Sequence, residues 1–153
     1  MGAEVSPILV STGTPNYWAL YIYIAVVTAA AFALARARLW RWLAITAVGF
    51  GLFWALPGID DAGAGTLAPH IFHVVVGFGL VALFIVAGLF YGPSAEPGRM
   101  DRVSSGAIVA YLLPAALLVL ARDHDPATLA AFAILTAASV AIAWRSDAAA
   151  GNR

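Results

Sequence analysis

One uninterrupted apolar run constrains this chain more than any other feature. From His70 to Tyr91 the sequence reads HIFHVVVGFGLVALFIVAGLFY and contains no Asp, Glu, Lys or Arg. As an α-helix, a segment of this length reaches about 30 Å, which is the thickness of the hydrocarbon core of a bilayer. The run therefore predicts a transmembrane helix, and further apolar runs flank it, two on each side.

The composition supports this interpretation. Hydrophobic residues make up 63% of the 153 residues, and charged residues only 10%. Soluble domains carry about 25% charged residues, so lipid must cover much of a chain with so few. The net charge is zero and no basic stripe is present, so we expect no nucleic-acid partner. Because the chain has no cysteine, it contains neither a disulfide framework nor a thiolate metal site.

Helix start and stop signals divide residues 1–153 into five spans of a single transmembrane domain. Thr14-Pro15 offers a hydroxyl N-cap and a first-turn proline before the first span, and Pro57-Gly58 ends the second. The predicted spans are 16–34, 42–56, 70–91, 105–121 and 127–144. The expected fold class is therefore all-α, an integral membrane helical bundle of about five transmembrane helices. Its expected partners are the lipid bilayer and either other transmembrane helices or further copies of the chain.

Three arginines, Arg36, Arg38 and Arg41, separate the first two spans without a glycine or proline. A single helix from 16 to 56 would be about 60 Å long and would bury these charges near its middle, so we expect a tight hairpin. With the N-terminus outside and alternating spans, every arginine except Arg122 falls on the inner side. The positive-inside rule thus predicts that the C-terminus is cytoplasmic. An outside N-terminus without a signal peptide is expected of a segment from a longer helical array.

The histidines form the first candidate site. His70 and His73 share one face of the central span, and Asp60 and Asp61 of the preceding outer loop could fold back over that end. His124 lies in the other outer loop. One interpretation is a metal or pH-responsive site at the outer mouth, with His70, His73, Asp60 and Asp61 as metal ligands. The alternative is that these histidines hydrogen-bond to loop carbonyls or to neighbouring helices.

The second candidate site is a cavity in the fourth span. Pro114 lies inside that span and should kink it, and Tyr111 lies one turn earlier. Such a kink could open a cavity for an apolar or lipid-like molecule. No charged residue lies deep within a predicted span, although pumps and ion-coupled transporters usually place one there. The buried hydroxyls are expected to bond across helices or back to their own helix. They belong to Thr28, Thr46, Tyr111, Thr136 and Ser139.

Small residues mark surfaces on which helices can approach closely. Alanines recur every four residues at 25, 29 and 33 in the first span and at 133, 137 and 141 in the fifth. The pentapeptide VGFGL occurs twice, at 48–52 and at 76–80. In a sequence this rich in apolar residues, chance is the default explanation of the repeat.

One third of the chain resembles a known family. The segment from Ser6 to Leu56 combines an apolar-Pro-apolar run, Ser11-Thr12-Gly13, an aromatic-rich span and a basic tryptophan-containing hairpin. These features resemble a recurrent block in very large bacterial predicted membrane proteins, domain of unknown function 2339. The resemblance implies an internal fragment or a short relative, in a bacterial inner-membrane helical array. The family brings no activity, cofactor or catalytic residue to carry over.

No motif in the chain indicates catalysis. There is no glycine-rich phosphate loop with lysine and no nucleophile elbow. We therefore expect no enzyme activity and no cofactor, and a structural or assembly role in the cell envelope. The alternatives are transport or binding of an apolar or lipid-like small molecule, and a metal or pH-responsive site at the outer mouth.

Overall fold

A computed structural model describes residues 16–38, 40–57, 59, 65–86 and 102–150, of which 41, 85–86, 102–105 and 145–150 are described by their backbone alone. These residues form five helices, and a π-helical turn extends the third of them. The elements are α2 (Tyr17–Arg38), α3 (Arg41–Trp54), α4 (Leu67–Val81), η1 (Ala82–Val86), α6 (Arg102–Ala121) and α7 (Pro126–Ala150). The described part of the chain contains no strand, so the all-α expectation is confirmed.

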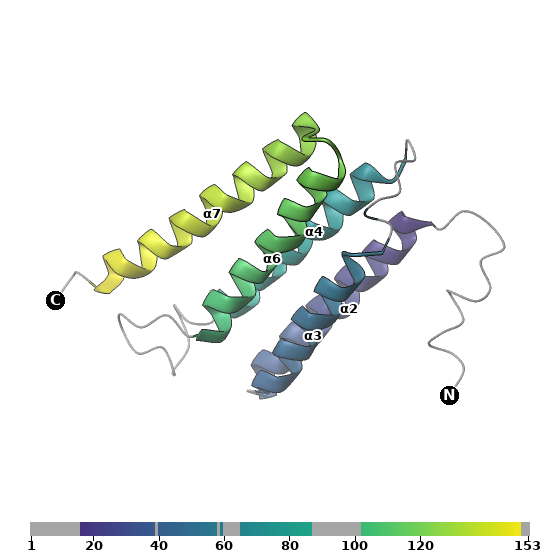
Figure 1. Ribbon diagram of the computed structural model, residues 1–153. Helices are drawn as coiled ribbons and strands as arrows, with labels where there is room; N and C mark the ends of the chain where they lie inside the picture. The colour runs from purple at the N-terminus through teal and green to yellow at the C-terminus, as the bar shows by residue number, and fades with distance from the viewer. Residues whose placement is uncertain (1–15, 39, 58, 60–64, 87–101, 151–153) are drawn as a thin grey trace, which may run out of the picture.

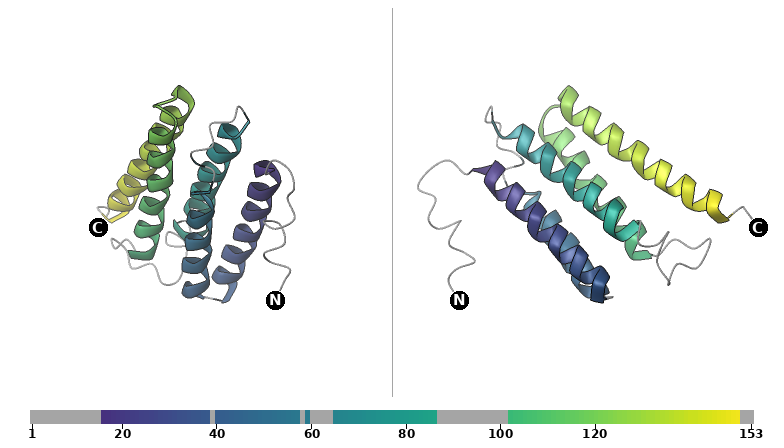
Figure 2. Two further views of the ribbon diagram at one scale, coloured as in Figure 1. Left: turned by 45° about the vertical axis from the view of Figure 1, so that its right-hand side comes forward. Right: turned by 180° about the vertical axis from the view of Figure 1, so that it is seen from behind.

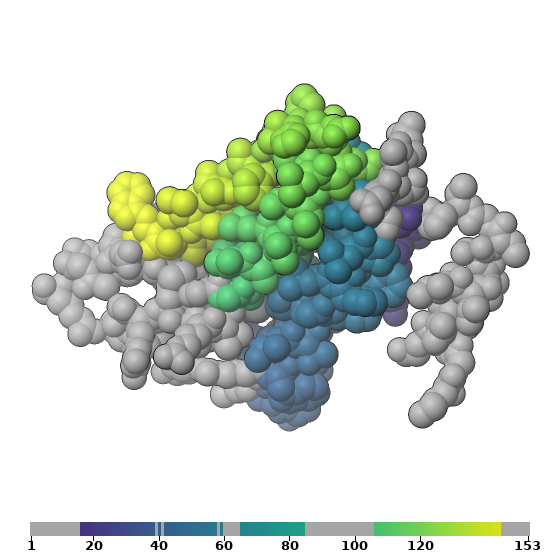
Figure 3. Space-filling model, in the orientation of Figure 1, coloured from purple at the N-terminus to yellow at the C-terminus, as the bar shows by residue number. Residues whose placement is uncertain are grey.

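The helices run up and down the bundle with α4 at its centre (Figures 1 and 2). α2 and α3 form one hairpin, and α6 and α7 form another. α4 packs against α2, α6 and α7, while α7 lies at the outer edge of the bundle. The space-filling view shows α3 and α6 side by side on one face, with α7 along its border (Figure 3).

The hairpin at the arginines forms as expected, although its boundaries differ. α2 continues to Arg38, four residues beyond the predicted end at Leu34. The amide nitrogen of Trp40 donates to the carbonyl oxygen of Ala35 at 2.9 Å and so closes the end of α2. Arginine side chains in a last helical turn interact favourably with the helix dipole, which explains why α2 extends to Arg38.

Among the described residues, three helices are both long and apolar enough to cross a membrane. These stretches are Tyr17–Arg38, Leu67–Phe84 and Pro126–Trp144, whereas Trp42–Trp54 and Gly106–Ala121 are shorter. Five spans therefore remain a prediction, and residues 87–91 of the central span lie outside the described residues. α3 has 14 residues, and at ~1.5 Å per residue it is shorter than the hydrocarbon core. The carbonyls released at its end therefore need partners inside the protein.

The core is centred on Tyr111 of α6, which is buried between α3 and α4. A Cβ atom built on Gly51 would lie 2.5 Å from Tyr111 Oη, and one built on Gly77 would lie 2.8 Å from Tyr111 Cζ. Both positions therefore require glycine while the tyrosine ring stays in place. Each copy of VGFGL supplies one of these two glycines, whereas Gly49 and Gly79 have no neighbour within 4 Å.

Candidate functional site

Two histidines of α4 contact the carbonyl-rich end of α3. His73 Nε2 lies 2.8 Å from the carbonyl oxygen of Gly51. His70 Nε2 lies 3.2 Å from the carbonyl oxygen of Pro57, and His70 Nδ1 lies 2.6 Å from that of Thr66. Both side chains are buried. The sequence left two interpretations of these histidines, a metal site and hydrogen bonding to loop carbonyls or neighbouring helices. The contacts observed here are of the second kind.

The backbone carbonyls at the end of α3 need hydrogen-bond donors from outside the helix. The last four carbonyls of any α-helix lack an intrahelical partner, and Gly51 is the fourth residue from the end of α3. The amide nitrogen of Ala55 donates to Leu52 at 3.1 Å. The carbonyl of Gly51 accepts from the His73 ring instead. In a membrane every backbone polar group must be satisfied within the protein, so His73 allows α3 to end early.

Both ring nitrogens of His70 are used in hydrogen bonds to backbone carbonyls. A neutral imidazole has one N–H group and an imidazolium has two. Both ring nitrogens of His70 face carbonyl oxygens, so the neutral ring donates to one and the protonated ring donates to both. His70 therefore links the end of α3 to the start of α4 through the carbonyls of Pro57 and Thr66.

Two tyrosines of α2 cover the histidine rings. Tyr21 stacks on His73 with ring centroids 4.4 Å apart and an interplanar angle of 17°. Its edge-to-face contact with His70 has a centroid distance of 5.2 Å, and Tyr17 lies 5.0 Å from the same ring. The hydroxyl of Tyr21 is buried and has no hydrogen-bond partner among the described residues. We call Tyr17, Tyr21, His70 and His73 the histidine–tyrosine cluster.

An arginine extends this cluster to the second hairpin. Thr66 directly precedes α4, and its hydroxyl accepts a hydrogen bond from Arg122 Nη2 at 2.9 Å. Arg122 belongs to the turn between α6 and α7, in which Asp123 and His124 have φ values of 49° and 63°. The carbonyl of Thr66 faces His70, so Thr66 connects Arg122 to the histidine–tyrosine cluster. Elements from both hairpins therefore meet at this end of the bundle.

The predicted metal site is described only in part. Asp60 and Asp61 lie outside the described residues, and His124 is exposed in the turn between α6 and α7. Within the described ranges, no group of three or more His, Cys, Asp or Glu side chains could hold a metal ion. The site formed by His70, His73, Asp60 and Asp61 stays a prediction.

The predicted cavity residues are buried in the core. The ring of Tyr111 packs against the glycines of α3 and α4, and Pro114 is buried within α6, which continues through it to Ala121. The prediction that these residues line a cavity is not tested by these contacts. Three of the hydroxyls singled out in the sequence bond back to their own helices, as expected. Thr46, Thr136 and Ser139 donate to Trp42, Phe132 and Leu135, at 2.9, 2.8 and 2.8 Å.

Tyr21 was not recognised from the sequence as part of a site. It lies among the aromatic residues that begin the first span, together with Trp18 and Tyr23, and such a cluster is typical of a membrane interface. Trp18 and Tyr23 are exposed, but Tyr21 is fully buried. The helical period contained the signal, because Tyr21 shares its face with Ile24, Thr28, Phe32 and Ala35, which are all buried.

Comparison with known proteins identifies the family. The family model described as "Predicted membrane protein (DUF2339)" matches residues 1–152. The chain belongs to the DUF2339 family. No curated protein and no solved structure matches it. The match extends the resemblance from one third of the chain to nearly all of it. This DUF2339 chain is a membrane protein with several apolar helices.

Proposed function

We propose that this DUF2339 chain is a non-catalytic helix-packing module, which forms part of a larger assembly in the bacterial inner membrane. In this proposal its N-terminus lies outside and its C-terminus lies in the cytoplasm. Polar side chains within the bundle support it, because the nitrogens of His70 and His73 and the hydroxyl of Thr66 join its elements to one another. Such contacts are typical of polar groups that stabilise helix packing in membranes.

The observation that carries the proposal is the unpartnered surface of α7. Only 11% of the apolar part of α7 is buried, compared with 39% for Leu67–Phe84. The alanine ridge at 133, 137 and 141 is exposed rather than used within the bundle. Exposed large side chains surround the ridge, namely Leu129, Ile134, Val140 and Trp144. A ridge of small residues between large apolar ones allows another transmembrane helix to approach closely.

Cysteine cross-linking tests whether a helix occupies this ridge. The natural chain has no cysteine, so single substitutions report on one position each. We expect Ala137→Cys, oxidised in native membranes, to form a covalent adduct with a second copy or another membrane protein. The matched control is Val109→Cys on α6, a position that is 64% exposed and has no alanine ridge. The proposal is wrong if neither variant forms an adduct, or if both form adducts equally.

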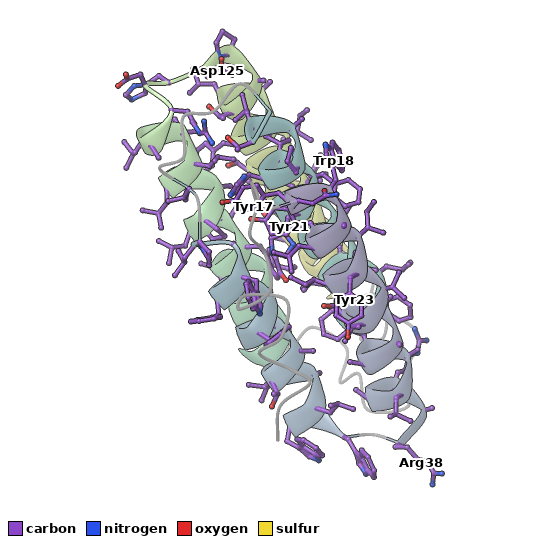
Figure 4. The ribbon with its side chains drawn as sticks, turned by 90° about the vertical axis from the view of Figure 1, so that its right-hand side faces the viewer. Tyr17, Trp18, Tyr21, Tyr23, Arg38 and Asp125 are labelled. Carbon is purple, nitrogen blue, oxygen red and sulfur yellow. The ribbon has the colours of Figure 1, made fainter. Side chains whose placement is uncertain are left out.

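Labelling from outside tests the proposed orientation. Arg38 and Asp123 are both exposed. Asp123 lies two residues before Asp125, and Figure 4 shows Asp125 and Arg38 at opposite ends of the bundle. An impermeant maleimide should label Asp123→Cys in intact cells and Arg38→Cys only after permeabilisation. The reverse pattern would show that the N-terminus faces the cytoplasm.

A further inference from the structure

The turn between α2 and α3 presents charge and aromatic surface together. The side chains of Arg36 and Arg38 are exposed at the end of α2. Trp40 and Trp42 follow, with 44% and 61% of their surface exposed. Their rings stack at a centroid distance of 5.8 Å and an interplanar angle of 29°. These four side chains form a surface that we call the Arg–Trp turn.

The positive charge of this turn is not neutralised by its own hairpin. From position 5 to position 59 the sequence contains three arginines and no Asp or Glu. The only arginine at the opposite turn, Arg122, is followed directly by Asp123 and, two residues later, by Asp125. The Arg–Trp turn is therefore complementary to a negatively charged partner.

The tryptophans indicate what kind of anionic partner fits. An indole ring has an apolar body and a polar N–H group, so tryptophan is enriched where hydrocarbon meets headgroups. Guanidinium groups bind phosphate oxygens through two parallel hydrogen bonds. The segment from Arg36 to Trp42 combines both properties, with two exposed arginines and a stacked tryptophan pair within seven residues at the end of an apolar hairpin.

We propose that the Arg–Trp turn selectively binds anionic phospholipids. The guanidinium groups of Arg36 and Arg38 contact the headgroup phosphate, and Trp40 and Trp42 pack against the glycerol and upper acyl region. Zwitterionic headgroups carry their own ammonium group, which offsets the phosphate charge, so they bind less tightly. Each basic residue near an anionic membrane surface raises the affinity for that surface about five-fold.

A lipid competition experiment tests this proposal with the full chain. The purified protein is equilibrated with equal amounts of phosphatidylglycerol and phosphatidylcholine of identical acyl chains. The lipid that remains bound is then counted by native mass spectrometry. We expect the natural protein to retain phosphatidylglycerol in preference, and the preference to weaken as salt is raised. Retention of both lipids in equal amounts would overturn the proposal.

Matched variants assign the preference to the turn. Replacing both arginines, Arg36→Gln with Arg38→Gln, should lower the relative affinity for phosphatidylglycerol about thirty-fold. The charge-preserving pair Arg36→Lys with Arg38→Lys should keep most of it. The control for net charge is Arg122→Gln, which removes an arginine at the opposite end of the bundle. The proposal is wrong if this control loses as much preference, or if the first pair loses none while circular dichroism shows that it is folded.

Discussion

The two ends of the bundle use arginine in opposite ways. At one end, Arg122 donates to Thr66 and so joins the α6–α7 turn to the histidine–tyrosine cluster. At the other end, Arg36 and Arg38 are exposed beside a stacked tryptophan pair. Figure 4 shows the length of the bundle between them, from Asp125 to Arg38. We call the first end, at the α6–α7 turn, the closed end, because Arg122 is bonded within the chain. We call the second end, at the Arg–Trp turn, the open end, because Arg36 and Arg38 are exposed.

This difference shows that the same residue type has different energetic consequences at the two ends. Removing a polar group that is hydrogen-bonded inside the protein, as Arg122 is to Thr66, loses that bond and costs about 0.5–1.5 kcal/mol, and more where the partner is a buried group left unsatisfied. An exposed charge is solvated by water or headgroups and contributes little to folding stability. Substitutions at the closed end should therefore change stability, and those at the open end should change lipid binding.

The largest expected effect is at His73. His73→Asn cannot reach the Gly51 carbonyl and loses the stack on Tyr21, so we expect it to destabilise the protein by about 2–3 kcal/mol. The matched control is His124→Asn, because His124 is exposed and asparagine tolerates its positive φ. Reversible unfolding in mixed micelles measures both. Equal losses of stability at the two positions would show that the contacts of His73 with Gly51 and Tyr21 do not stabilise the closed end.

Gly77 should be nearly as sensitive. A methyl group there would meet the Tyr111 ring at less than 3.0 Å, so Gly77→Ala should cost about 1–3 kcal/mol through overpacking. Gly79→Ala, on the same helix with open space around it, should instead be neutral or stabilising by up to about 1 kcal/mol. Thermal unfolding in nanodiscs compares the pair. If Gly79→Ala is the more damaging of the two, Tyr111 does not occupy the position described here.

A smaller effect, about 1–2 kcal/mol, is expected for Gly51→Ala. The added methyl would meet the hydroxyl of Tyr111, whose removal leaves Cζ as the nearest atom, at 3.7 Å. Tyr111→Phe should therefore relieve most of the cost of Gly51→Ala but little of the cost of Gly77→Ala, where ring carbons lie too close. A double-mutant cycle measures this coupling. Equal relief at the two glycines would contradict the geometry of the ring.

The smallest stability effect compares the two ends directly. Arg122→Gln should lose the hydrogen bond to Thr66 and cost about 1 kcal/mol. Arg38→Gln, at an exposed position, should change stability by less than about 0.5 kcal/mol. The same unfolding measurement serves for both. A larger cost at Arg38 than at Arg122 would reverse the assignment of the closed and open ends.

Some of the site could have been predicted from the sequence and some could not. The shared face of His70 and His73 follows from the helical period, and the structure places both side chains in the interior. Their partners do not follow from it, because the Gly51 carbonyl belongs to another helix, 22 positions away. In the sequence, chance is the default explanation of the two VGFGL copies, yet each supplies a glycine that contacts Tyr111. Only the packing of three helices distinguishes these glycines from Gly49 and Gly79.

The sequence alone determined that the chain is helical, apolar and folded back at its arginines. Hydropathy and charge act locally, through transfer of each segment from water to lipid, so they can be read along the chain. The tertiary structure decided which groups satisfy the carbonyls at the end of α3. It also decided which of the aromatic residues at the start of α2 is buried. These outcomes depend on close contacts between helices distant in sequence, and steric fit and hydrogen-bond geometry exist only after the helices have packed.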